Sequence, residues 1–114
     1  YNLEASGHGA WTELAVFVRD DAGELAAGID ADVWSDCCEV NLLWVHESER
    51  GNGTGSRLLT AIEDEARARG CTRMVLDTFS FQAKPFYERH GYELVGSIPG
   101  FPKGHEWYSM TKRL

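Results

Sequence analysis

Long apolar runs are missing from this sequence of 114 residues. No stretch approaches the roughly 20 consecutive apolar residues that a transmembrane helix needs. The first residues also lack the basic region followed by an apolar core that marks a secretory signal peptide. We therefore expect a cytoplasmic protein with no membrane partner.

Cysteine is scarce and poorly placed for disulfide bonds. The chain has 3 cysteines, which is an odd number. Cys37 and Cys38 are neighbours, and neighbouring side chains on a strand point to opposite faces. No spacing of cysteine and histidine resembles a zinc site. We expect free thiols, buried as small apolar side chains, and no metal.

Basic residues are outnumbered by acidic ones. The chain has 11 Lys and Arg against 18 Asp and Glu, which gives a formal net charge of −7. A nucleic-acid surface needs a basic stripe, so the composition argues against such a partner. Asp30, Asp32, Asp36 and Glu39 lie close together in the sequence and could attract an amine. For the three aspartates a solvated acidic surface is an equally good explanation.

The composition that remains is that of one small domain, with 43% hydrophobic residues and room for a single core. Apolar spacing and turn residues predict strands over residues 11–18, 24–32, 37–45, 74–76, 92–97 and 105–112. The first three strands form an antiparallel meander, and the strand at 74–76 runs parallel to the one at 37–45. A helix over 56–69 has an apolar face and exposed ion pairs between residues 63 and 67 and between 65 and 69, with Gly70 as its cap. A short helix follows, with Pro85 in its first turn and Gly91 at its end.

The most informative stretch is Arg-Gly-Asn-Gly-Thr-Gly at residues 50–55, between a predicted strand and a predicted helix. Glycines let the backbone approach a ligand closely, and the start of a helix offers unpaired N–H groups to an anion. Arg50 adds a guanidinium that can hold two phosphate oxygens. The loop does not match a Walker motif or a dinucleotide fingerprint, because the required lysine or third glycine is missing. A pyrophosphate site is favoured over a flexible connector, which stays the alternative.

Two motifs resemble the GNAT superfamily of N-acetyltransferases. The pattern Arg50-x-x-Gly53-x-Gly55 is similar to the acetyl-CoA loop of that family, and Phe-Tyr-Glu-Arg within residues 82–92 is similar to its second landmark. The resemblance implies an α/β (α+β) fold: a mixed, mostly antiparallel sheet with a central parallel strand pair and flanking helices. Residues 1–114 would form one such domain. Family members begin with a further strand and one or two helices, so we expect an N-terminally incomplete domain.

The resemblance also implies an enzyme, an acetyl-CoA-dependent N-acyltransferase. It would transfer the acetyl group to a primary amine by direct attack in a ternary complex, without a metal. The acceptor could be a small molecule or a peptide, because variable loops form the acceptor pocket in this family. A non-catalytic acyl-CoA-binding or regulatory module is the alternative. A homodimer is also left open.

The resemblance assigns roles to individual residues. Tyr87 matches a tyrosine that serves as general acid toward the leaving thiolate, although it could simply pack in an aromatic core. Glu39 is the candidate general base, and a partly buried glutamate in an ion pair is an equal alternative. Asn41 shares its face of the strand. Ser80 stands where many members have an asparagine that touches the coenzyme arm. The cofactor-binding residues are Leu43, Val45, Arg50, Gly51, Asn52, Gly53, Thr54, Gly55, Ser56 and Ser80.

Overall fold

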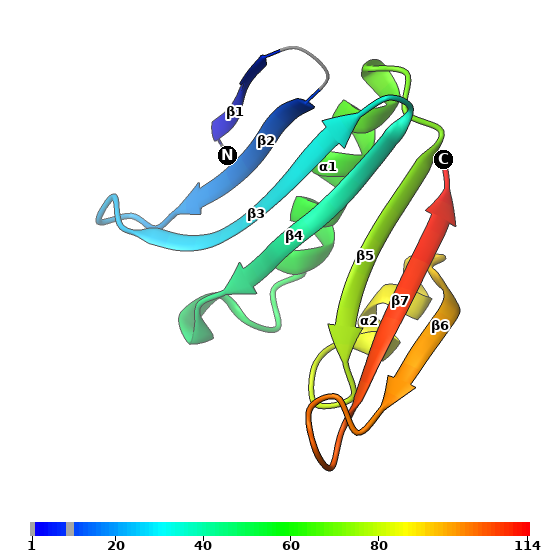
Figure 1. The fold of residues 1–114 in the computed structure, drawn as a ribbon. Helices are drawn as coiled ribbons and strands as arrows, with labels where there is room; N and C mark the ends of the chain where they lie inside the picture. Colours follow the sequence, from blue (N-terminus) through cyan, green and yellow to red (C-terminus); the bar gives the residue numbers. More distant parts are fainter. Residues whose placement is uncertain (1, 9–10) are drawn as a thin grey trace.

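The computed structural model describes residues 2–8 and 11–114. The described chain forms a seven-stranded sheet in the order β1-β2-β3-β4-β5-β7-β6, with its helices on one side (Figure 1). The strands are β1 (Asn2–His8), β2 (Trp11–Arg19), β3 (Leu25–Trp34), β4 (Cys37–Val45), β5 (Arg73–Phe79), β6 (Glu93–Pro99) and β7 (Glu106–Arg113). The helices are a 3₁₀ turn η1 (Glu47–Glu49), α1 (Thr54–Ala68) and α2 (Lys84–Arg89).

The predicted fold class is confirmed. β2, β3 and β4 form the expected antiparallel meander, and β4 and β5 form the parallel pair. The crossover between them is α1, which ends as predicted: Gly70 has a φ of 85°, and the N–H of Cys71 donates to the carbonyl of Ala66 at 2.9 Å. This is the hydrogen bond of a Schellman cap. No helix within the described residues is long and apolar enough to span a bilayer.

One strand was not predicted. The sequence pattern predicts a sheet that starts at Trp11 with no strand before it, but β1 pairs antiparallel with β2, with Leu3 opposite Val16. Residues 2–8 contain no β-branched or aromatic residue, so local propensity gives no strand signal there. The strand exists through its pairing with β2. Tyr1, at which the chain starts, lies outside the described residues.

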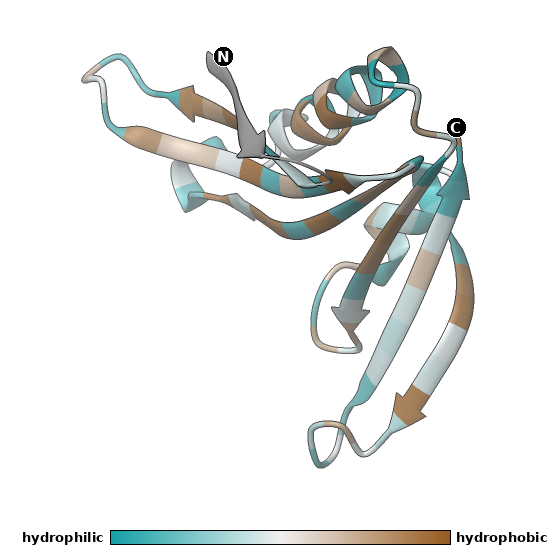
Figure 2. Cartoon of the chain, turned by 45° about the horizontal axis from the view of Figure 1, so that its top comes forward, coloured by the Kyte–Doolittle hydropathy of each residue, from teal (hydrophilic) through white to brown (hydrophobic). Residues whose placement is uncertain are grey.

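α1 covers one face of β2–β4 with its apolar side, as Figure 2 shows. Leu58, Leu59, Ile62 and Ala66 are fully buried there, which confirms the predicted helix face. The predicted exposed ion pair between Glu63 and Arg67 is wrong. The Glu63 carboxylate is buried, accepts a hydrogen bond from the Tyr92 hydroxyl at 2.7 Å, and pairs with the Lys112 ammonium at 3.0 Å. Arg67 pairs with Asp64 instead.

The sheet opens between β4 and β5. Their parallel pairing runs only from Cys37 opposite Arg73 to Val40 opposite Leu76, and beyond these residues the two strands diverge (Figure 1). At the same point the pairing of β3 with β4 shifts, so that Asn41 is an extra residue between Val40 and Leu42. Such a bulge bends and twists a strand. The bulge therefore lies where β4 turns away from β5.

Candidate active site

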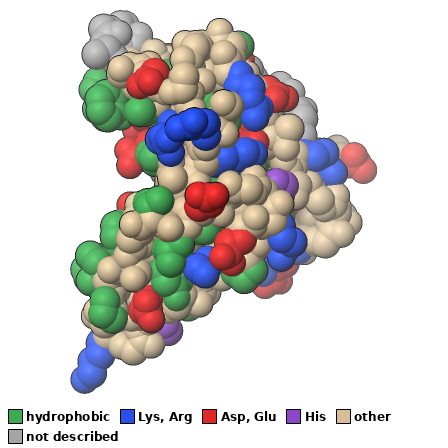
Figure 3. Space-filling model, turned by 90° about the vertical axis from the view of Figure 1, so that its right-hand side faces the viewer, with side chains coloured by type: hydrophobic (Ala, Val, Ile, Leu, Met, Phe, Trp, Pro, Cys, Tyr) green, Lys and Arg blue, Asp and Glu red, His purple; other side chains and the backbone are tan. Residues whose placement is uncertain are grey.

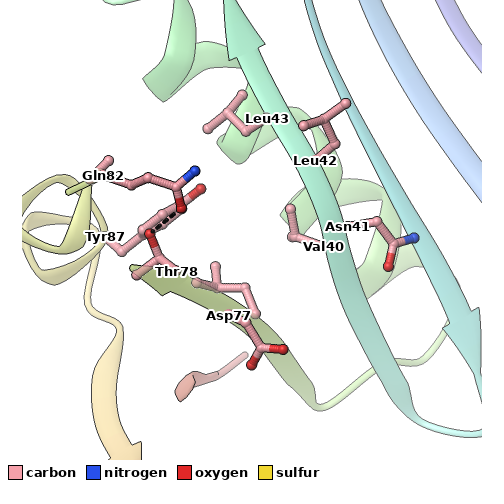
Figure 4. A pocket seen from close by; sticks show the side chains of 10 residues that line it. Val40, Asn41, Leu42, Leu43, Asp77, Thr78, Gln82 and Tyr87 are labelled. Atoms are coloured by element: carbon pink, nitrogen blue, oxygen red, sulfur yellow. Dashed lines mark hydrogen bonds between the residues drawn. The ribbon is translucent and has the colours of Figure 1, made fainter. Parts of the chain in front are cut away.

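The opening between β4 and β5 contains a cavity of about 240 Å³. β4 supplies Leu43 and Asn41 to its wall, and β5 supplies Asp77 and Thr78. α2 closes the helix side with Tyr87, preceded by Gln82. Figure 4 shows the Tyr87 ring and the Gln82 amide facing Leu43 across the gap, with Thr78 hydrogen-bonded to Gln82. A strand edge, a phenol and several polar groups thus share one opening.

Two buried tyrosines lie side by side near this cavity, but only Tyr87 lines it. Their ring centroids are 5.8 Å apart. The Tyr92 hydroxyl is engaged with Glu63, whereas no hydrogen bond of the Tyr87 hydroxyl is found within the described residues. Burial raises the pKa of the Tyr87 phenol above its ordinary value of 10.0. Tyr87 therefore keeps its proton at neutral pH and has a hydroxyl free to donate it.

A second cavity, of about 350 Å³, lies at the far end of β4. The glycine-rich loop forms one side of it, and Phe86 and Arg89 of α2 form the other. Val45 at the end of β4 also lines it. Because Leu43 lines the first cavity and Val45 the second, the two sites are linked by one short length of strand. Along this length, no pairing with β5 occupies the strand edge.

The loop has the backbone geometry of an anion site. Gly51 and Gly53 have φ angles of 82° and 75°, a left-handed conformation that side chains rarely adopt. Gly53 is the N-cap of α1, and in the part of the chain that the structure describes it has no side-chain cap hydrogen bond. The first hydrogen bond of the helix runs from the N–H of Arg57 to the carbonyl of Gly53. The N–H groups of residues 53–56 are therefore without helical partners, at the positive end of the helix dipole.

Arginine side chains shape this loop. Arg57 donates to the Asn52 carbonyl at 2.8 Å and to the Thr54 hydroxyl at 3.0 Å, so its guanidinium fastens the loop to the first helical turn. Arg50 donates from Nε to the Val45 carbonyl at 3.2 Å, and both Arg50 and Arg89 line the cavity. The sequence motif of the loop contains Arg50 but neither Arg57 nor Arg89. Arg57 is held by local contacts at the start of α1, whereas Arg89 lines the cavity from α2.

Phe86 and His90 tie the loop to α2. A Cβ built on Gly55 would lie 3.4 Å from the Phe86 ring, so the ring packs directly against the loop. The Ser56 hydroxyl is 2.9 Å from Nε2 of His90. The helix that carries Tyr87 is thus fixed to the loop by an aromatic contact and a hydrogen bond.

The structure brings most of the predicted cofactor-binding residues together. The loop residues Arg50, Gly51, Gly53, Thr54, Gly55 and Ser56 line the second cavity with Val45, and Asn52 is held beside them by Arg57. Ser80 is placed elsewhere. It lies after β5, where its hydroxyl accepts a hydrogen bond from the N–H of Glu106 at 2.9 Å, and it lines neither cavity.

Glu39 also lies outside both cavities. It is half-buried on β4, opposite Asp32 on β3 and Val75 on β5, within the paired part of the sheet. Asn41, two residues further on, donates to the Asp32 carboxylate at 2.9 Å. Among the aromatic residues considered for an acceptor pocket, Phe79, Phe81 and Phe101 cluster at the end of β5. Trp34 instead stacks on Trp11.

Comparison with known proteins decides the family. The model of the acetyltransferase (GNAT) family matches residues 3–92. The chain belongs to this family. It is therefore related to acetyltransferases, and the predicted enzyme class is confirmed. Within the described residues no cluster of three or more histidine, cysteine or acidic side chains could hold a metal ion.

Individual relatives support the assignment. Blasticidin-S acetyltransferase of Streptomyces morookaense is 41% identical over 101 residues, which are 88% of this chain and 74% of that protein. The crystal structure of an acetyltransferase from Bacillus cereus superposes with a TM-score of 0.88 at 38% identity, over 91% of this chain and 74% of the other. An aminoglycoside 6'-N-acetyltransferase complexed with coenzyme A has a TM-score of 0.78 at 24% identity, over 89% and 72% of the two chains. This last likeness concerns the fold alone.

Proposed function

We propose that this protein transfers the acetyl group of acetyl-CoA to a primary amine by direct attack in a ternary complex. One observation carries the proposal: Tyr87 lines the opening between β4 and β5, and the edge of β4 that is not paired with β5 leads from this opening to the glycine-rich loop. An anion site and a proton donor thus lie at the two ends of one strand segment. The coenzyme A complex of a protein with this fold is consistent with such a ligand.

The residues present fit acetyl-CoA. The free N–H groups of residues 53–56 would bind the pyrophosphate, and Arg50 and Arg89 would neutralise part of its charge. The unpaired edge of β4 over residues 41–45 would hydrogen-bond the amides of the pantetheine arm, as an added strand would. The loop needs no side chain at Gly53 for this role, because its donors are backbone groups.

The chemistry requires two proton movements. The amine loses a proton as its nitrogen bonds to the carbonyl carbon of the thioester, and the sulfur gains one as the C–S bond breaks. Tyr87 is the proposed donor to the sulfur, since its raised pKa keeps the phenol protonated. Glu39 remains the proton acceptor predicted from the sequence.

The acceptor is proposed to be a small-molecule amine. The relative from Streptomyces morookaense is named for blasticidin S, and aminoglycoside acetyltransferases share the fold. The net charge of −7 suits a cationic acceptor. A panel of blasticidin S, kanamycin, spermidine and an amide of Nα-acetyl-lysine samples the relevant classes. Release of free thiol from acetyl-CoA reports the transfer.

The glycine-rich loop is tested by Gly53→Val, with Gly70→Val as the matched control. Both glycines have left-handed φ angles, 75° and 85°, so both substitutions strain the backbone by about 1–2 kcal/mol. Gly53 is in the loop, and Gly70 follows the other end of α1. Calorimetric titration with acetyl-CoA should show binding lost for Gly53→Val and kept for Gly70→Val. Equal affinity of the two folded variants would contradict a role for this loop in binding.

Measurement of thiol release then distinguishes an acetyltransferase from a non-catalytic binding protein. Binding by the wild-type protein together with release that depends on an added amine would support the transferase. Saturable binding without release for any amine of the panel would instead favour a non-catalytic acyl-CoA-binding protein.

A further inference from the structure

Asp77 is a carboxylate in the β4–β5 opening that no sequence motif singled out. Val40 opposite Leu76 is the last parallel pair of β4 and β5, and Asp77 is the next residue of β5. It therefore stands at the point where the strands separate. It lines the same cavity as Tyr87 and Asn41. Figure 4 shows its carboxylate at the rim of this opening, on the β5 side.

Asp77 and Tyr87 approach the opening from opposite faces of the sheet. Along β5, Met74, Leu76 and Thr78 are buried, and the first two belong to the core cluster that contains the apolar face of α1. Strand alternation therefore directs the Asp77 side chain to the helix-free face. Tyr87 comes from α2, on the helix-covered face. A group that enters from the helix-free face therefore contacts the Asp77 carboxylate, and the Tyr87 phenol lies on the opposite face.

The Asp77 carboxylate has no competing partner among the described residues. Asp32 and Asp36, by contrast, accept hydrogen bonds from Asn41 and Thr72, each at 2.9 Å. Asp77 is exposed and pairs only through its backbone, opposite Ser109 of β7. Its oxygens are therefore available to an incoming ligand, and a cationic or hydrogen-donating ligand is the one they bind.

The surroundings of Asp77 suit an organic amine. Phe79, two residues further along β5, stacks on Phe81 with ring centroids 5.3 Å apart, and Phe101 lies 6.4 Å from Phe79. Figure 3, in which the helix-free face forms the left edge, shows apolar side chains gathered along that edge. A carboxylate beside exposed rings recognises an ammonium group on an apolar body.

Resting on the acetyl transfer proposed above, we infer that Asp77 binds the acceptor amine and takes the proton that its nitrogen loses. The bound ammonium first releases one proton to solvent. The neutral amine then attacks the carbonyl carbon of the thioester, and the nitrogen becomes positively charged as the N–C bond forms. One N–H proton passes to a carboxylate oxygen of Asp77. The C–S bond breaks, the electron pair goes to sulfur, and the Tyr87 hydroxyl protonates the sulfur. The products are the acetamide and the free thiol, and solvent restores both protonation states.

Glu39 is the competing carboxylate, and geometry separates the two. Glu39 lies inside the paired region, opposite Asp32 and Val75, and does not line the cavity. Asp77 lies beyond the last pair of β4 and β5 and does line the cavity. Alternation along paired strands puts both on the helix-free face. The same amine could approach either carboxylate. Variants of Asp77 and of Glu39 are therefore compared to decide which one takes the proton.

The experiment measures thiol release with the amine of the panel that the wild-type protein uses best. Asp77→Asn is nearly isosteric and removes the charge. It should lower kcat/KM for the amine by about 100-fold or more, the usual effect of losing a general base. KM for acetyl-CoA should stay unchanged, because Asp77 lies away from the loop. Asp77→Glu should recover part of the lost rate, since it restores a carboxylate.

Two further variants complete the test. Asp21→Asn, in the exposed turn after β2, removes the same charge far from the opening and should keep the full rate. Glu39→Gln should change kcat/KM by less than about tenfold if Asp77 is the acceptor. An unchanged rate for Asp77→Asn, with a large loss for Glu39→Gln, would overturn the inference and leave the transferase intact. No release by the wild-type protein would overturn the proposed transfer and the role of Asp77 with it.

Discussion

At the scale of single residues, the two neighbouring tyrosines have different tasks. Tyr87→Phe removes the proposed acid, so kcat should fall by about 100-fold, while the affinity for acetyl-CoA stays the same. Tyr92→Phe removes the hydroxyl that donates to Glu63. It should lower the free energy of unfolding by about 1.5–3 kcal/mol, the range for hydrogen bonds to charged groups, and leave kcat unchanged.

Steady-state thiol release and urea unfolding of both variants check this division. We expect opposite patterns: Tyr87→Phe should lower kcat without lowering the free energy of unfolding, and Tyr92→Phe should do the reverse. A normal kcat in Tyr87→Phe would remove Tyr87 from the mechanism.

Sequence reasoning works at the residue scale where a motif is local. Arg50, Gly53 and Gly55 are close in sequence, and their geometry depends on one strand-to-helix turn, so they could be assigned in advance. Asp77 could not. Alternation places it on a face of β5, but only the three-dimensional pairing shows that β5 leaves β4 directly before it.

At the scale of secondary structure elements, Glu63 joins α1 to β7 across the edge of the core. Its carboxylate is buried and bound by Tyr92 and Lys112. Glu63→Ala would leave a buried hydroxyl and a largely covered ammonium without their partner. We expect it to lower the free energy of unfolding by about 3 kcal/mol or more.

Glu65→Ala on the same helix is the matched control. Glu65 pairs with Arg69 at 2.9 Å in a partly exposed i,i+4 bridge, so its loss should cost less than about 1 kcal/mol. Chemical denaturation of the two variants gives both values. Equal costs would contradict the assigned role of Glu63.

The same helix shows why element predictions succeed in part. Its apolar face and its glycine cap follow from local periodicity and backbone conformation, and both were predicted. Glu63 also fitted a local rule, the i,i+4 pair with Arg67, but its true partners come from β7 and from the residue that precedes β6. β1 could not be predicted for a related reason, because only its pairing with β2 makes it a strand.

At the scale of the whole molecule, the core should make the fold labile to alkali. Burial raises the pKa of the Cys38 thiol from 9.0 to about 12, and it also raises the pKa values of Tyr87 and Tyr92. The folded protein keeps these protons while the unfolded chain loses them. The stabilisation is therefore fully present below pH 9 and is lost as the pH rises toward 12, with about 1.4 kcal/mol per pH unit from Cys38 alone.

Urea unfolding in reducing buffer at pH 8, 9 and 10 measures this dependence. Cys38→Ala lowers stability at every pH by loss of packing, but it should flatten the decline between pH 9 and pH 10. An identical slope in the variant would show that the Cys38 thiol does not contribute.

The central claim is that acetyl-CoA binds along β4 with its pyrophosphate on the loop before α1. The most direct test is a titration of the ¹⁵N-labelled protein with coenzyme A, followed by amide chemical shifts. The largest shifts should belong to the N–H groups of residues 53–56, followed by those of residues 41–45, while that of Gly70 should stay in place. Saturable binding with the largest shifts elsewhere, or no shift in residues 53–56 at saturation, would contradict the account.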